Sequence, residues 1–223
     1  MTFPVLHLIT MDRDARHPGS LDTIRALCSR CGPSLAVHLR IRDLNDAELL
    51  DVALAVREIA DGSGSWCVVN GRVDVALGAR AHAVQLGKGS LPVHVARGLL
   101  PSAVLIGASV HDREMAELRV REGCDYLVLG TMYTTGTHLH GLIGGPQLLR
   151  RCTEAVSEVP IVAIGGIDRT RVAEIVAGGA SGIAVNRAVW GNADPSNEAQ
   201  KLVSILEDAR AGRSDSAPRE GTG

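Results

Sequence analysis

The sequence predicts a single (β/α)8 barrel, in which eight parallel strands alternate with helices. Short apolar runs recur along almost all of the 223 residues, and helix-like segments separate them. Most of these runs are continuously apolar, which is typical of parallel strands that are buried on both faces. Eight such units in about 200 residues fit a barrel near its lower size limit. A doubly wound open sheet is the structural alternative.

The elements follow in order along the chain. The expected strands are residues 5–10, 35–41, 66–70, 83–87, 104–110, 126–130, 161–166 and 182–186. Two helical segments have clear starting signals. Residues 45–60 begin at Asn45 and residues 112–123 begin at Asp112, and both Asn and Asp are common helix caps. A short helix is expected within 184–191. The barrel is expected to span residues 1–210, followed by a polar tail at 211–223 that is predicted to be disordered.

Cys28 and Cys31 have the CxxC spacing and lie in the first predicted helix. No second pair accompanies them, so they are expected to be buried free thiols rather than a metal or redox pair.

Composition excludes several classes of protein. The net charge is -2, and the chain holds only one Phe, two Tyr and two Trp, so neither a basic surface nor stacking rings are available for nucleic acid. No apolar run reaches the length of a membrane span, and residues 1–10 do not read as a signal peptide. We therefore expect a cytoplasmic protein with neither a nucleic-acid partner nor a membrane partner.

Polar side chains follow the ends of five predicted strands. In a barrel these ends form one mouth, where active sites lie. The candidates are His38, Arg40, Arg42, Asn70, Arg72, Gln85, Lys88, Ser109 and His111, together with the loop "GTMYTTGTHLHG" at 130–141. Most of them are basic or uncharged, which favours an anionic ligand.

The last two strands are followed by loops that suit a phosphate group. Gly165 and Gly166 follow one strand, and Val185 and Asn186 lead from the other into a short helix. Free backbone N–H groups at such helix starts bind phosphate, and barrels commonly build this site from their last two loops. The glycines could instead serve only tight packing between strand and helix.

These motifs, taken together and in this order, resemble the thiamine phosphate synthase superfamily from about residue 5 to 208. The similar stretches are "HLRIRD", "VVNGRVDVAL", "VQLGKGSLP", "IGASVH", "DYLVLGTMY", "VAIGGI" and "GIAVNRAVW". Synthases of this superfamily carry carboxylates that hold the magnesium of a pyrimidine pyrophosphate. Gly71 and Ser90 occupy those two places here, and His138 stands where a lysine would follow the threonines.

The resemblance therefore favours the TenI-like branch, whose members are thiazole tautomerases. It implies an isomerase that aromatises a thiazole carboxylate phosphate by moving a proton, with no cofactor and no magnesium. Thr131 stands where that branch places its histidine, so His138 is the first candidate for the proton shuttle and His38 and His140 follow. His7, His82 and His94 are expected to be structural or exposed.

The ligand-binding residues expected from the strand ends, the loops and the resemblance form one set. They are Arg40, Arg42, Asn70, Ser109, Thr131, Thr135, Thr137, Gly165, Gly166, Val185 and Asn186. Two other functions stay open: a thiamine phosphate synthase, which joins the thiazole phosphate to the pyrimidine, and a non-catalytic paralogue that binds a thiamine-related phosphate. The expected partners are a small phosphorylated thiazole, further copies of the chain in a homo-oligomer, and thiazole synthase.

Overall fold

The protein folds as a closed barrel of eight parallel strands, which confirms the predicted fold class. The computed structural model describes residues 2–134 and 144–215. Because β8 pairs with β1, the open-sheet alternative is wrong. The strands are β1 Leu6–Met11, β2 Leu35–Arg40, β3 Trp66–Asn70, β4 Ala83–Leu86, β5 Leu105–Val110, β6 Tyr126–Gly130, β7 Ile161–Ile164 and β8 Gly182–Val185.

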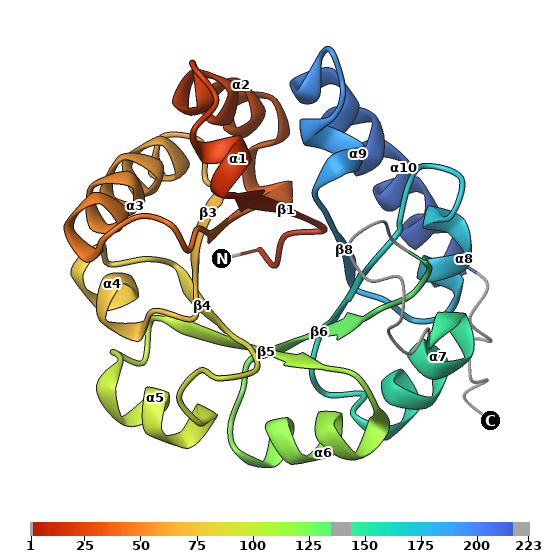
Figure 1. Ribbon diagram of the computed structural model, residues 1–223. Helices are drawn as coiled ribbons and strands as arrows, with labels where there is room; N and C mark the ends of the chain where they lie inside the picture. Colours follow the sequence, from red (N-terminus) through yellow and green to blue (C-terminus); the bar gives the residue numbers. More distant parts are fainter. Residues whose placement is uncertain (1, 135–143, 216–223) are drawn as a thin grey trace, which may run out of the picture.

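Helices surround the barrel and cover the outer face of its strands (Figure 1). They are α1 Asp12–Ala15, α2 Ser20–Cys31, α3 Asp46–Asp61, α4 Val73–Gly78, α5 Val93–Leu99, α6 Arg113–Arg121, α7 Gly145–Ala155, α8 Val172–Ala177, α9 Arg187–Trp190 and α10 Pro195–Asp215, with a short 3-10 turn at Gly32–Ser34. Both predicted caps form. Asn45 accepts a hydrogen bond from the Glu48 N–H, and Asp112 accepts one from the Met115 N–H.

Two apolar cores hold the barrel together. The larger one lies between the strands and the helices, and the smaller one fills the barrel interior. The interior core consists of Ile9, Ala36, Trp66, Val68, Ala83, Tyr126, Val128, Val162 and Ala184. Since side chains alternate along a strand, the residues in step with these also point inward, toward the axis of the barrel.

The N-terminal segment crosses the end of the barrel at which the strands begin (Figure 1). Phe3 packs there against the rings of His7, Trp66 and Tyr126, with ring centroids 5.5 to 5.6 Å apart. These aromatic rings close one end of the barrel interior, so the other end is the mouth.

Three further expectations concern the helices. Cys28 and Cys31 are buried and free, as predicted. Helix α10 continues to Asp215, five residues beyond the predicted end of the barrel at 210, and 216–223 lie outside the described residues. Among the helices that the structure describes, none is long and apolar enough to span a membrane.

Candidate functional site at the mouth of the barrel

Four strands send polar side chains inward near the mouth. His38 and Arg40 lie on β2, Asn70 ends β3, Gln85 lies on β4 and Ser109 on β5. Nδ1 of His38 lies 3.2 Å from the Asn70 side-chain oxygen, and Nε2 of Gln85 donates to the Ser109 hydroxyl at 3.0 Å. The structure therefore brings these sequence-predicted residues into two neighbouring polar contacts.

Arg40 is half-buried at the end of β2. Among the described residues its side chain forms no ion pair and no hydrogen bond. Burial lowers the pKa of its guanidinium, the nearby charge of Arg42 lowers it further, and Asp12 opposes both effects. A cation that has lost water without gaining a partner is well prepared to bind an anion.

Arg42 lies two residues beyond Arg40, at an exposed position after the end of β2. Asp12 holds this loop, because its carboxylate accepts hydrogen bonds from the backbone N–H groups of Arg42 at 2.7 Å and Asp43 at 2.8 Å. These two bonds lower the pKa of the Asp12 carboxyl despite its partial desolvation. Arg42 therefore adds charge at the rim, whereas Arg40 reaches toward the interior.

Gly165 and Gly166 allow two loops to approach each other closely. Both have positive φ, at 108° and 65°. A Cβ on Gly165 would lie 2.6 Å from Cγ2 of Thr131, and one on Gly166 would lie 2.9 Å from the backbone oxygen of Thr134. Both positions therefore require glycine, for conformation and for space. Thr131 and Tyr133 follow β6, so this contact places residues 131–134 beside the loop after β7.

The Gly166 loop is fixed from its outer side. Arg171 donates to the Gly166 carbonyl and lies 4.3 Å from the centre of the Tyr133 ring, whose hydroxyl donates to Glu174 at 2.5 Å. The N–H of Gly166 has no partner among the described residues. Helix α8 begins only at Val172, so the expected helix start is displaced by a turn over 167–171, and the loop N–H groups are what a phosphate would meet.

The β8 loop is tied to the first strand. The side-chain nitrogen of Asn186 donates to the Ile9 carbonyl at 2.7 Å and to Asp14 at 2.6 Å, and its oxygen accepts from Arg13 at 2.8 Å. Its backbone N–H has no partner within the described chain. Asn186 can therefore offer its backbone to a ligand, while its side chain closes the barrel. Val185 itself is buried. Sequence reasoning missed Arg13 and Asp14, which carry no motif.

Gly71 and Ser90 lie side by side at the mouth, as expected for the two positions at which synthases carry their magnesium-binding carboxylates. A Cβ on Gly71 would be 3.6 Å from the Ser90 hydroxyl oxygen. That hydroxyl accepts from the Gly87 N–H at 3.0 Å, and no carboxylate stands at either position. The described residues also contain no cluster of three potential metal ligands. Since magnesium prefers carboxylate oxygens, these two residues do not fit a protein-bound magnesium ion.

The remaining basic candidates lie at the rim. Arg72 binds Asp74 through two nitrogens at 2.9 and 2.6 Å and binds Asp46 at 2.8 Å, so helices α3 and α4 hold it. Lys88 is exposed. His111 is exposed as well, and its Nδ1 lies 2.6 Å from the Gly130 carbonyl.

The histidine candidates divide into two groups. His38 is buried, and its Nε2 lies 2.8 Å from Nδ1 of His7, a contact that no sequence motif indicated. The other two histidine candidates and two of the threonines, His138, His140, Thr135 and Thr137, lie outside the described residues.

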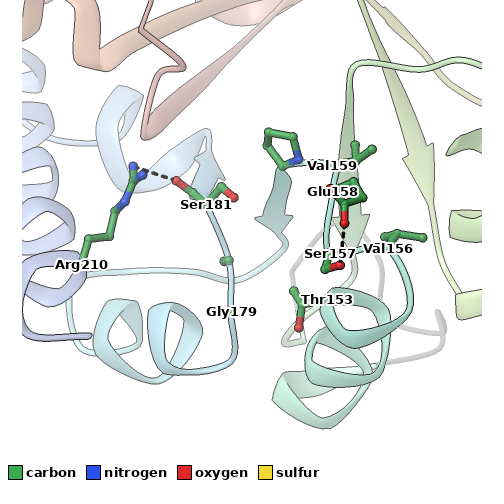
Figure 2. A pocket seen from close by; sticks show the side chains of 10 residues that line it. Thr153, Val156, Ser157, Glu158, Val159, Gly179, Ser181 and Arg210 are labelled. Atoms are coloured by element: carbon green, nitrogen blue, oxygen red, sulfur yellow. Dashed lines mark hydrogen bonds between the residues drawn. The ribbon is translucent and has the colours of Figure 1, made fainter. Parts of the chain in front are cut away.

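One surface hollow lies away from the mouth. Figure 2 shows its lining, which comes from the end of α7, from the loops that precede β7 and β8 and from α10, and it includes Thr153, Ser157, Glu158 and Ser181. Arg210 donates to the Ser181 carbonyl there. Because it lies at the strand starts, this hollow is on the opposite end of the barrel from the site.

Comparisons with known proteins agree along nearly the whole chain. The family model described as "Thiamine monophosphate synthase" matches residues 6–189. The thiamine-phosphate synthase of Methanoculleus marisnigri is 38% identical over 207 residues, 92% of this chain and 97% of the relative. A putative thiamine-phosphate synthase of Geobacter sulfurreducens is 36% identical, covering 90% and 93%. The solved thiamine phosphate pyrophosphorylase from Pyrococcus furiosus superposes with a TM-score of 0.82 at 32% identity, covering 92% and 96%.

These findings overturn the predicted thiazole tautomerase. The relatives are named as synthases, and the prediction depended on only a few positions, chiefly Gly71, Ser90 and His138. Gly71, Ser90 and their neighbours form only one part of a mouth that many loops build. As evidence for the reaction, these positions therefore count for less than the similarity to synthases along the whole chain. The isomerase role given to His138, His38 and His140 is withdrawn with that reaction.

Proposed function

The chain belongs to the thiamine monophosphate synthase family, and on that premise we propose that it is a thiamine-phosphate synthase, a transferase. The reaction joins a thiazole phosphate to a pyrimidine that carries a diphosphate. The bond between pyrimidine and diphosphate breaks, the bond between pyrimidine and thiazole forms, and the diphosphate leaves with the electron pair.

The observation that supports this proposal best is the convergence of anion-binding groups on one mouth of the barrel. The partnerless N–H groups of Gly166 and Asn186 suit the phosphate of the thiazole. Arg40, half-buried and without a partner in the described chain, suits the second anionic group. A single phosphorylated ligand would need one such site, whereas a transferase with two phosphorylated substrates needs both.

The leaving diphosphate gathers negative charge as its bond breaks. Since Gly71 and Ser90 do not fit a protein-bound magnesium ion, the cations of this chain must oppose that charge from their own positions. Arg40 lies nearest the interior, and Arg42 and Lys88 lie at the rim. Arginine is suited to this task because its planar fork can bind two phosphate oxygens.

A second candidate function rests on the same pair of residues. Because Gly71 and Ser90 lack the charge of the synthase pattern, the chain could bind the thiazole phosphate without joining it to the pyrimidine. It would then act as a regulatory binder of a thiamine-related phosphate.

One assay separates the two candidates. The protein is incubated with the pyrimidine diphosphate and the thiazole phosphate, with magnesium or with EDTA, and thiamine phosphate is followed by chromatography. A synthase yields product that Arg40→Ala lowers at least tenfold, with Arg121→Lys, at an exposed position at the end of α6, as the control. No product under either condition, together with a rise in melting temperature on adding thiazole phosphate, favours the binder.

A further inference from the structure

A line of three polar side chains runs through the barrel interior, from its closed end to its mouth. Nε2 of His7 lies 3.2 Å from the Pro4 carbonyl oxygen, Nδ1 of His7 lies 2.8 Å from Nε2 of His38, and Nδ1 of His38 lies 3.2 Å from Asn70. Both imidazoles are fully buried, with 0% exposure, whereas Asn70 is half-buried at the end of β3. Pro4 lies in the N-terminal segment that also carries Phe3.

The contact with Pro4 determines which atom donates and which accepts in each hydrogen bond of this line. A carbonyl oxygen can only accept, so Nε2 of His7 must carry the proton and Nδ1 of a neutral His7 must accept. Nε2 of His38 must then donate to it, which leaves Nδ1 of His38 without a proton. The atom of Asn70 that faces His38 must therefore be a donor.

Asn70 can satisfy this requirement in only one way. The oxygen and nitrogen of a side-chain amide occupy equivalent positions, so the hydrogen-bond network determines which is which. The nitrogen of Asn70 must face Nδ1 of His38, and its oxygen must then face the mouth.

These proton positions require both imidazoles to be neutral, because an imidazolium would donate from both nitrogens. Burial lowers the pKa of His38 to about 4. Burial, and then the neighbouring His38, lower the pKa of His7, and the contact with Pro4 offsets this only in part. Both rings are accordingly neutral near pH 7.

We propose that His7 is a positioning residue, which acts through His38 to turn the Asn70 amide so that its carbonyl oxygen faces the mouth. The site then presents an acceptor at this point, and a bound molecule must offer it a donor such as an amino or hydroxyl group. This inference goes beyond the proposed transferase, since any ligand of the mouth meets the same polarity.

The first test is an NMR measurement on the native protein, without ligand, at pH 7.5, with histidine labelled by 15N. We expect both His7 and His38 to carry their proton on Nε2, with a nitrogen–nitrogen coupling across the bond between them. His82 is an internal reference, because its Nδ1 lies 3.0 Å from the Cys67 N–H and must accept from it. A proton on Nδ1 of His7 or His38, or a charged ring, would overturn the proposal.

The second test compares two variants of His7. His7→Gln keeps one acceptor and one donor, so His38 should keep its proton on Nε2. His7→Leu removes the acceptor, so His38 should move its proton to Nδ1 and the Asn70 amide signals should shift. An unchanged His38 in a folded His7→Leu protein would show that His7 does not position it. If that variant fails to fold, the spectrum of the native protein still decides.

Discussion

Arg40 is the residue on which the mouth depends most. Most other cations of the site have protein partners: Arg72 binds two aspartates, Arg13 binds Asp14 and Asn186, and Arg171 binds the Gly166 loop. Arg40 is partly desolvated and has no such partner among the described residues. A charge in this state costs folding free energy until an anion arrives.

The replacement Arg40→Met tests whether the charge of Arg40 lowers the stability of the unliganded protein. Methionine keeps an unbranched stem and removes the charge, so we expect stabilisation of about 1 kcal/mol, or about 2–4 °C in melting temperature for a chain of this size. Affinity for inorganic diphosphate should fall at least tenfold. Thermal unfolding and isothermal titration measure the two effects. Arg42→Met at the exposed rim is the control for the melting temperature, and a lower melting temperature for Arg40→Met would show that Arg40 does have a stabilising partner.

Residues 71 and 90 allow a gain-of-function test. In the double variant Gly71→Asp, Ser90→Asp, two carboxylates would stand close together, and the φ of 77° at Gly71 should cost roughly 1 kcal/mol for any side chain. We expect millimolar magnesium to raise the melting temperature of the double variant and to leave the native protein unchanged.

The matched control is Gly71→Asn with Ser90→Asn, which has the same shape and no charge. Equal stabilisation of the native protein by magnesium would mean that the ion binds without these two positions.

At the scale of elements, local patterns determined most of what could be predicted. All eight strands and both capped helices lie where the sequence placed them, because continuous apolar runs and capping residues act over only a few neighbours. The Gly166 loop was predicted less well. Asp168 accepts from the Thr170 backbone and hydroxyl, and this local turn delays helix α8 to Val172.

Contacts between distant segments escaped prediction. His7 was expected to be structural or exposed, and it is buried, but its partner His38 lies 31 residues away and neither residue stands in a motif that links them. Asn186 was expected to meet the ligand through its backbone, but the hydrogen bond from its side chain to Asp14 across the barrel seam was not predicted. Pairs of this kind depend on the closure of the whole sheet, so a pattern read along one segment does not contain them.

The start of α3 provides a prediction at this scale. Asn45 and Glu48 exchange two hydrogen bonds, each 3.0 Å long, in a capping box. Asn45→Ala should lower the free energy of unfolding by about 1 kcal/mol, measured by urea denaturation. Glu48→Gln keeps the reciprocal bond and should change stability by a few tenths of that amount. Equal losses from both replacements would mean that charge, rather than the box, stabilises the helix start.

At the scale of the whole molecule, buried histidines give the fold a pH dependence. Burial lowers the pKa of both His38 and His82 to about 4 from 6.5, and for His82 the charge of Arg57 adds to this effect. Between pH 6.5 and 4 the unfolded chain binds protons that the folded protein does not. The contribution of these two neutral histidines to the free energy of unfolding is therefore complete above pH 6.5, and it is lost as the pH falls through this window.

Urea denaturation at a series of pH values measures this loss, and His38 alone should account for roughly 3 kcal/mol by pH 4. The lowered pKa values of Asp12, Asp74 and Asp168 do not interfere, because their contribution is lost only below 3.8. His38→Gln should remove the share of the pH dependence that belongs to His38 and leave the share of His82, and His94→Gln at an exposed position should preserve the whole. A midpoint that stays constant from pH 7 to pH 4.5 would contradict the assignment.

The seam between the first and last strands has a consequence for protein synthesis. Asn186 meets Asp14 from 172 positions further along the chain, and β1 pairs with β8 on that side. A nascent chain therefore carries β1 with one open edge until β8 has left the ribosome, and such edges invite pairing with other chains. Until that moment the growing polypeptide also lacks half of its phosphate cradle. Emergence of β8 thus completes the sheet and the anion site in a single event, so the complete anion site can assist only the last stage of folding.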